Sequence, residues 1–284
     1  MKKSVFTMLL ALALIVGFTM AAPAQAADKN VKLVYVEWDC ATAATHVMKA
    51  VLEDMGYTVE TIPVAAAAMW QAMSTGDADG MVCAWLPVTH ADYLAKVKDN
   101  VENLGPNTKG AKIGWVVPKY VTINSIEELN ANKDKFDGKV IGIDPGAGLM
   151  KKSENAIKDY GLNFELIEGS GATMTAALAD AVKNNKWVVV TGWSPHWMFG
   201  RWDLKYLADP KGVFGAEETI NTVVRKDLKK DMPDVYTVLN NFEWSADTLQ
   251  KIMAQNQEKG ADPDTTAKKW VKDHPDVVKK WEGK

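Results

Sequence analysis

Short apolar runs alternate along the chain with longer segments that place an apolar residue every three or four positions. The runs predict buried strands and the periodic segments predict amphipathic helices. In the first half, strands are expected at residues 31–37, 58–62 and 81–85, with helices at residues 42–55 and 65–74. In the second half, strands are expected at residues 139–143, 164–167 and 187–191, with helices at residues 149–160 and 173–184.

The two halves repeat the same order of elements, and their third strands end in similar phrases. Ala-Trp-Leu-Pro stands at residues 84–87 and Gly-Trp-Ser-Pro at residues 192–195. Alternating strands and helices predict parallel sheets with right-handed crossovers. Residues 32–36 and 187–191 are almost continuously apolar, as expected for sheets covered on both faces. The predicted fold is therefore α/β, with two similar lobes and a cleft between them.

The connections between the lobes follow from the segments that remain. A strand-like run at residues 112–117 is expected to leave the first lobe, and the chain is expected to return near residues 212–225. The first lobe would then comprise residues 27–115 and 213–284, and the second lobe residues 116–212. The helical tail would pack on the first lobe, with its tryptophans as packing residues: Trp244, Trp270 and Trp281.

The N-terminus predicts export. Lys2 and Lys3 precede an apolar run at residues 5–20, and small residues at Ala24 and Ala26 form a cleavage pattern. These features predict a signal peptide at residues 1–26. A membrane anchor is disfavoured because the run is short for a span of about 20 residues. The mature chain is expected to be free in a bacterial periplasm.

The composition of the chain bears on nucleic-acid binding, disulfide formation and metal or cofactor binding. The formal charge is −3 with both signs interspersed, so no nucleic-acid surface is expected. Cys40 and Cys83 either form a disulfide, as an oxidising compartment allows, or remain as two buried thiols. There is no C-x-x-C pair, and the four histidines are scattered. We therefore expect neither a metal site nor a cofactor.

Eleven tryptophans are many for a chain of this length. Ligands of parallel α/β sheets bind beyond the carboxyl ends of the strands, and Trp38, Trp85 and Trp193 fall at such ends. Residues 144–149 fall at another. The remaining tryptophans of the two lobes are expected to be weaker candidates or packing residues: Trp197, Trp202, Trp70 and Trp115.

Three longer phrases carry a resemblance to a known family. Residues 142–150 (GIDPGAGLM), 191–199 (TGWSPHWMF) and 203–211 (DLKYLADPK) resemble the glycine betaine-binding subunits of ABC importers. The resemblance extends over nearly the whole mature chain. It implies a two-lobed periplasmic-binding-protein fold, a box of three tryptophans for the trimethylammonium group, a membrane permease as partner, and a role in osmoprotection. We expect a monomer.

The resemblance assigns the box to Trp38, Trp85 and Trp193, two from the first lobe and one from the second. A quaternary ammonium has no N–H group, so hydrogen bonds cannot hold it. Indole faces offer apolar contact together with cation–π attraction of about 2 kcal/mol when desolvated. They also disfavour small, strongly hydrated cations.

A betaine also carries a carboxylate. Residues 144–148 follow a strand and open a helix, where free backbone N–H groups can bind an anion. The resemblance gives this role to the amides of Gly148 and Leu149 and to a histidine that matches His90. His196 is the rival histidine.

Asp39 follows the first tryptophan of the box. It is expected to cap the first helix, as Thr42 also could. If Asp39 instead faces the ligand, choline becomes more plausible, because choline brings no carboxylate of its own.

Two kinds of alternative remain. The same fold could bind choline, carnitine, proline betaine or ectoine. An enzyme is disfavoured, because H-E-x-x-H, P-loop and G-x-S-x-G motifs are missing from the sequence and because Ser194 and His196 are too close together to form a relay.

Overall fold

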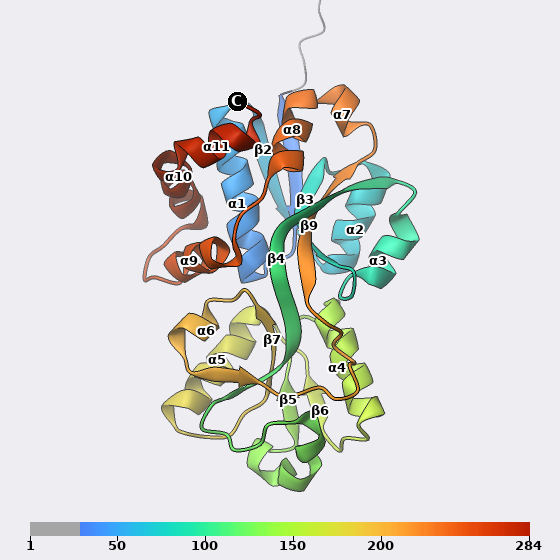
Figure 1. The fold of residues 1–284 in the computed structure, drawn as a ribbon, viewed down its shortest axis with the longest axis vertical. Helices are drawn as coiled ribbons and strands as arrows, with labels where there is room; N and C mark the ends of the chain where they lie inside the picture. Colours follow the sequence, from blue (N-terminus) through green and yellow to red (C-terminus); the bar gives the residue numbers. More distant parts are fainter. Residues whose placement is uncertain (1–28) are drawn as a thin grey trace, which may run out of the picture.

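The computed structural model describes residues 29–284. The expected signal peptide at residues 1–26 therefore lies outside the described residues. Two lobes lie one above the other along the long axis of the molecule, joined by the long strand β4 (Val101–Pro118) (Figure 1). The two-lobed α/β fold expected from the repeat is confirmed.

The upper lobe contains a mixed five-stranded sheet in the order β2-β1-β3-β9-β4. Its first three strands are β1 (Asn30–Tyr35), β2 (Thr58–Pro63) and β3 (Gly80–Leu86). They lie close to the expected runs, and β1 pairs in parallel with both β2 and β3. β9 (Glu218–Arg225) is antiparallel to both β3 and β4. Only part of the sheet is therefore parallel, because β9 enters it from the other lobe. Its helices are α1 (Asp39–Asp54), α2 (Ala66–Thr75) and α3 (Ala91–Val97).

The lower lobe repeats this arrangement on the other half of β4. β7 (Val190–Ser194) and β8 (Leu204–Tyr206) pair antiparallel with β4, whereas β5 (Lys139–Ile141) pairs in parallel with β7 and with β6 (Glu165–Ile167). Its helical segments are η1 (Ile126–Glu128), η2 (Asn130–Phe136), α4 (Gly148–Asp159), α5 (Gly171–Lys183) and α6 (Met198–Arg201).

The third strand of the lower lobe begins three residues later than expected. Residues 187–191 were the predicted strand, but β7 starts at Val190. Trp187 instead packs edge-on against Phe136 at 5.2 Å, beneath the ammonium group of Lys135. Trp193 consequently lies inside β7 and not after its end.

β4 passes from one lobe to the other. It pairs with β9 as far as Ala111 and with β7 from Lys112 onward. β9 brings the chain back to the upper lobe. The exact lobe boundaries at residues 115 and 213 stay a prediction.

The C-terminal helices pack on the upper lobe (Figure 1). They are α7 (Leu228–Asp231), α8 (Pro233–Asn241), α9 (Ala246–Asn256), α10 (Pro263–Asp273) and α11 (Pro275–Trp281). Trp270 stacks on Trp281 at 5.6 Å, and Trp244 meets both rings edge-on. The predicted packing role of the tail tryptophans is confirmed.

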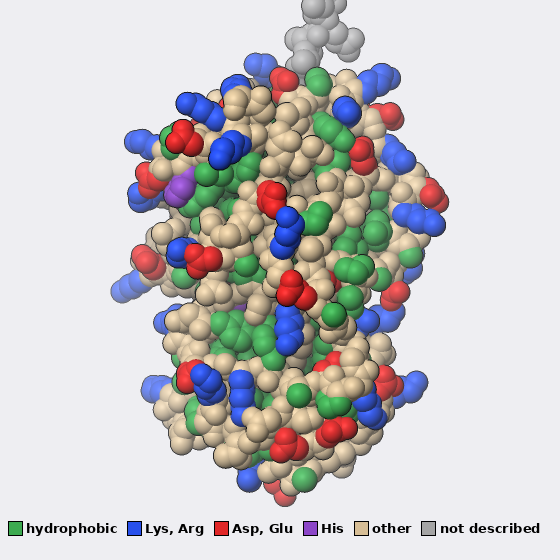
Figure 2. Space-filling view, in the orientation of Figure 1, with side chains coloured by type: hydrophobic (Ala, Val, Ile, Leu, Met, Phe, Trp, Pro, Cys, Tyr) green, Lys and Arg blue, Asp and Glu red, His purple; other side chains and the backbone are tan. Residues whose placement is uncertain are grey.

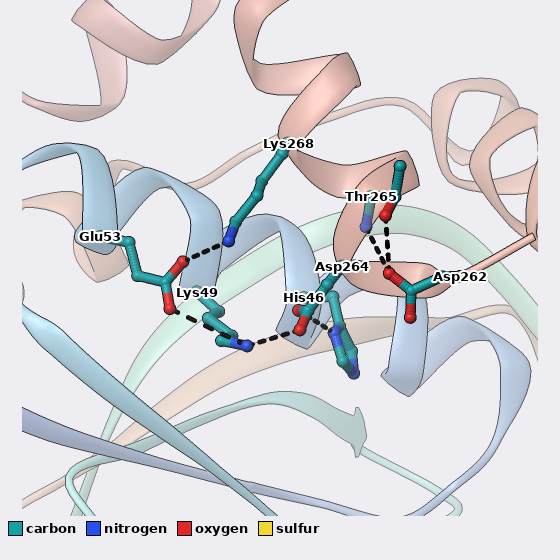
Figure 3. A network of polar contacts seen from close by, with 7 residues as sticks. All are labelled: His46, Lys49, Glu53, Asp262, Asp264, Thr265 and Lys268. Atoms are coloured by element: carbon teal, nitrogen blue, oxygen red, sulfur yellow. Dashed lines mark hydrogen bonds and ion pairs between the residues drawn. The ribbon is translucent and has the colours of Figure 1, made fainter.

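A polar network joins α10 to α1 (Figure 3). Asp264 Oδ1 lies 2.6 Å from His46 Nδ1, and Lys49 Nζ donates to Asp264 Oδ2 at 2.7 Å. Burial alone would raise the pKa of Asp264, but the hydrogen bonds from Lys49 and His46 outweigh burial and lower it. His46 is thus a structural residue of α1.

The surface seen in Figure 2 carries Lys, Arg, Asp and Glu side chains interspersed over both lobes. Within residues 29–284, no helix combines the length and the apolar character that crossing a bilayer requires.

Candidate ligand-binding site

A small cavity lies between the lobes. Both lobes and the connecting strand contribute to its wall. The lining residues are Trp38, Cys40, Trp85, Thr89, His90, Ile113, Ile143, Ala147, Gly148, Leu149 and Trp193. Six of the lining residues are predicted ligand-binding residues: Trp38, Trp85, His90, Gly148, Leu149 and Trp193.

The three predicted box tryptophans converge on this cavity. Trp38 immediately precedes α1, Trp85 lies in β3 and Trp193 lies in β7, and each side chain is buried. Trp38 Nε1 donates to Asp144 Oδ1 of the lower lobe at 2.8 Å. Because that polar atom is satisfied outside the cavity, the indole can serve as an apolar wall.

The two cysteines are free thiols in the structure. Cys40 lines the cavity, whereas Cys83 Sγ donates to Met69 Sδ at 3.5 Å. The disulfide alternative is therefore not realised, because Cys83 faces α2 and Cys40 faces the cleft. Burial raises the pKa of Cys83 to about 12 and raises that of Cys40 well above its ordinary range. Cys40 thus presents a neutral, weakly polar wall.

His90 also reaches the cavity, and its geometry makes it a donor. Its Nδ1 accepts the backbone N–H of Trp85 at 3.1 Å, so the neutral ring carries its proton on Nε2. Burial lowers the pKa of His90 to about 3, which keeps the ring neutral. Nε2 is buried and has no hydrogen-bond partner. The ring is packed between Trp38 at 5.6 Å and Trp70 at 5.8 Å.

The first turn of α4 supplies two more donors. The N-cap residue Ala147 makes no side-chain capping bond. The amides of Met150 and Lys151 bond to the carbonyl of Ala147, at 3.0 and 3.3 Å. The first four N–H groups of a helix have no hydrogen-bond partner within the helix. Here the N–H groups of Gly148 and Leu149 are available to bind an anion, which would lie at the positive end of the helix dipole.

Gly148 also allows the lobes to meet. A Cβ atom at this position would lie 2.1 Å from the carbonyl oxygen of Thr89 in the upper lobe. Tyr93 Oη donates to the carbonyl of Gly146 at 2.7 Å, and Lys151 pairs with Asp92. These contacts hold the two lobes against each other around the cavity.

Asp39 lies outside the cavity lining, and the capping prediction for it is wrong. Trp38 is the N-cap residue of α1, and no side chain caps this helix. The carboxylate instead accepts from Gln257 Nε2 at 2.8 Å through Oδ1, and its Oδ2 lies 3.2 Å from His196 Nε2. The Asp39 carboxylate therefore lies against Gln257 and His196 and does not line the cavity. Thr42, the alternative capping residue, does not cap the helix either.

His196 is the counterpart of His90 in the lower lobe. Its Nδ1 accepts the backbone N–H of Met198 at 3.1 Å, and its ring meets Trp193 edge-on at 4.5 Å. The side chain is buried, and Nε2 is close to Asp39 without being aligned for a hydrogen bond. His196 does not line the cavity, so of the two rival histidines only His90 does.

The other tryptophans lie elsewhere. Trp70 and Trp115 are core residues, and Trp115 Nε1 donates to Ser153 Oγ at 2.9 Å. Trp197 and Trp202 pack against each other at 5.4 Å, next to the guanidinium of Arg201.

Sequence reasoning missed several lining residues. Thr89 precedes His90, and Ile143 and Ala147 lie in or beside the predicted loop. Their closeness in sequence to predicted site residues could have identified them. Cys40 was expected to be a disulfide partner or a buried thiol, and was not predicted to line the site. Ile113 lines the cavity because β4 passes between the lobes, which no local pattern reveals.

Comparison with known proteins decides the family. The family described as the substrate-binding domain of ABC-type glycine betaine transport systems matches residues 29–273. The chain belongs to this family. A curated relative, the glycine betaine/carnitine transport binding protein GbuC of Listeria monocytogenes serotype 1/2a (strain 10403S), is 50% identical over 163 residues. That match covers 55% of this chain and 54% of the relative, so it spans about half the relative's length.

Solved structures extend the similarity to almost the whole fold. Lactococcal OpuAC, in its closed-liganded conformation with glycine betaine, is 46% identical with a TM-score of 0.84, covering 89% of this chain and 99% of that one. The ProX protein of Borrelia burgdorferi is 40% identical with a TM-score of 0.87, covering 89% and 96%. A choline-binding protein in complex with choline is 28% identical with a TM-score of 0.84, covering 90% and 92%.

Proposed function

We propose that this chain is the extracytoplasmic receptor of an ABC importer and that it captures glycine betaine. The observation that carries the proposal is the composition of one cavity. Three buried tryptophans, the unpartnered Nε2 of His90 and the two free amides at the start of α4 line the same small space. Such a cavity fits a solute with a quaternary ammonium at one end and a carboxylate at the other.

The ammonium end would be held by Trp38, Trp85 and Trp193. Each indole face contributes about 1–2 kcal/mol of cation–π attraction when the cation is desolvated. Because the three residues come from both lobes, a cation between them would stabilise the contact of the lobes. This is the energetic basis of closure around a ligand.

The carboxylate end would be held by His90 Nε2–H and by the amides of Gly148 and Leu149. All three donors are neutral groups, since the pKa of His90 is lowered to about 3 by burial. Hydrogen bonds to a charged acceptor contribute about 1.5–3 kcal/mol each. The positive end of the α4 dipole adds to this attraction.

The same donors argue for a zwitterion over a simple cation. No Asp or Glu side chain of residues 29–284 lines the cavity. With choline bound, the donors would stay buried and unpaired, at a cost of about 1–3 kcal/mol for each. Choline is therefore the second candidate, supported by the similarity to the choline-binding protein. Carnitine, proline betaine and ectoine remain alternatives of the same class.

Delivery to a membrane permease completes the proposed function, and the closed lobes would be the surface that the permease recognises. Membership in an ABC transport family supports such a partner. We place the mature protein in the periplasm, as a monomer, with uptake of a compatible solute as its role.

Calorimetric titration of the mature protein with glycine betaine, choline, carnitine and ectoine tests the proposal. We expect micromolar binding of glycine betaine, accompanied by a change in tryptophan fluorescence, and weaker binding of choline. Tighter binding of choline than of glycine betaine would refute the carboxylate-binding role of His90, Gly148 and Leu149. If none of the four ligands binds, the proposed ligand class is wrong.

A further inference from the structure

The loop that carries His90 is held by a single buried carboxylate from outside the cavity. This loop, residues 87–90, lies between β3 and α3. Glu218, the first residue of β9, is only 3% exposed. Its Oε2 accepts the backbone N–H groups of Val88 at 3.1 Å and of Thr89 at 3.0 Å. Its Oε1 accepts the hydroxyl of Thr89.

These three bonds account for the burial of the charge. Within residues 29–284, no Lys or Arg side chain forms an ion pair with Glu218. An ionised carboxylate is an acceptor only, and bonds to such an acceptor are stronger than bonds between neutral groups. The charge of Glu218 therefore depends on the loop for its hydrogen bonds, and the loop depends on Glu218 for its shape.

The residue bound by Glu218 is itself part of the cavity wall. Thr89 lines the cavity, and its carbonyl oxygen faces Gly148 of the lower lobe. His90 follows directly in the chain. A shift of Thr89 would move both the contact between the lobes and the Nε2–H donor of His90.

Glu218 also marks the point where the chain returns from the lower lobe. It pairs with Ala111, the last residue of β4 that pairs with β9. Gly215, with φ of +76°, packs so closely on Val88 that a Cβ atom there would lie 2.9 Å from Val88 Cγ1. Residues 215 and 218 of the returning segment thus contact the loop at two points.

We propose that Glu218 is a positioning residue for the carboxylate end of the ligand. It transmits the position of the returning segment to Thr89, and so sets His90 Nε2 relative to the amides of Gly148 and Leu149. This inference rests on the proposed function, because it assumes that a carboxylate occupies that end of the cavity.

Two substitutions separate shape from charge. Glu218→Ala removes all three acceptors and leaves the amides of Val88 and Thr89 without partners. Glu218→Gln keeps the shape, since its oxygen can accept both amides while its NH₂ group donates to the Thr89 hydroxyl. Exposed Glu217, its neighbour in the chain, provides the matched control Glu217→Ala.

The first readout is glycine betaine affinity in a double-mutant cycle with His90→Ala. We expect Glu218→Ala to weaken binding about tenfold, Glu218→Gln less than threefold, and Glu217→Ala not at all. The variant carrying both Glu218→Ala and His90→Ala should bind no more weakly than His90→Ala alone. Additive losses, or equal losses for the Ala and Gln variants, would overturn the proposal.

The second readout needs no ligand. Amide hydrogen exchange at Val88 and Thr89 reports whether their N–H groups remain bonded. We expect exchange to accelerate more than tenfold in Glu218→Ala and to stay near the wild-type rate in Glu218→Gln. Unchanged exchange in Glu218→Ala would show that Glu218 does not hold the loop. Failure of the wild-type protein to bind glycine betaine would instead refute the proposed function, while the exchange rates would still decide whether Glu218 fixes the loop.

Discussion

Trp38 Nε1 donates to Asp144 Oδ1 at 2.8 Å, and this bond links the upper lobe to the lower lobe at the edge of the cavity. Trp38 is therefore both a wall of the cavity and a contact between the lobes. Its indole contributes an aromatic face to the first role and an N–H group to the second. A substitution that separates the two roles measures each of them.

Trp38→Phe keeps an aromatic face and removes the N–H group. We expect glycine betaine binding to weaken about tenfold, because the lost bond had a charged acceptor worth about 1.5–3 kcal/mol. Asp144→Ala should cause a similar loss, and the double variant no further loss. The measurement is a titration of all four proteins. Fully additive effects would show that the two side chains act independently.

Replacing any one of Trp38, Trp85 and Trp193 with Ala should weaken glycine betaine binding about tenfold or more, since each face contributes about 1–2 kcal/mol. Trp187→Ala, in the lower lobe and outside the cavity, is the matched control and should leave the affinity unchanged. Calorimetric titration of the four variants with glycine betaine measures these affinities. Wild-type affinity in all three box variants would exclude a tryptophan cage.

His90 should make the protein acid-labile in a defined pH range. Its pKa is lowered by burial to about 3, against about 6.5 in an unfolded chain. Below the unfolded value the unfolded chain binds the proton first, so the stability that neutral His90 contributes is complete above about pH 6.5 and falls progressively toward pH 3. We expect the free energy of unfolding of His90→Gln to decline less steeply than that of the wild type between these values. Denaturant titrations at several pH values measure this, and parallel profiles would contradict the assignment.

Gly148→Ala should prevent the lobes from closing. The new Cβ atom would lie 2.1 Å from the backbone oxygen of Thr89, and backbone cannot yield as a flexible side chain can. We expect binding to weaken about a hundredfold or more, with little change in the midpoint of thermal unfolding. Gly146→Ala is the control, because the nearest atom to its Cβ would be Tyr93 Oη at 4.0 Å. A Gly148→Ala protein that binds normally would show that the cavity does not need this approach of the lobes.

The sequence predicted correctly those features of the fold and of the site that depend on residues close together in the chain. The order of elements followed from apolar periodicity, and each lobe repeats it independently. The spacing between Trp85 and His90 brought both to the cavity because the loop between them is short and bonded back to its own strand. The start of α4 could be placed because small residues follow a strand there.

Prediction failed where a partner comes from far along the chain. Asp39 was expected to cap α1, but its carboxylate accepts a hydrogen bond from Gln257 and lies 3.2 Å from His196 Nε2, and neither residue is near it in sequence. The contact of Trp38 with Asp144 depends on how the lobes meet, which periodicity cannot show. The strand β7 was placed three residues early because Trp187 is apolar enough to extend the run, although it packs on Phe136.

The two histidines that follow the repeated strand ends are used differently, although their Nδ1 atoms are held alike. His90 offers Nε2–H to the cavity, whereas His196 has Asp39 of the opposite lobe in front of its Nε2. His196 does not line the cavity, so the repeated frame places a histidine donor on one side of it only. The space between the lobes therefore differs at its two ends. For the dipolar solute proposed above, such a space would favour one orientation over the other.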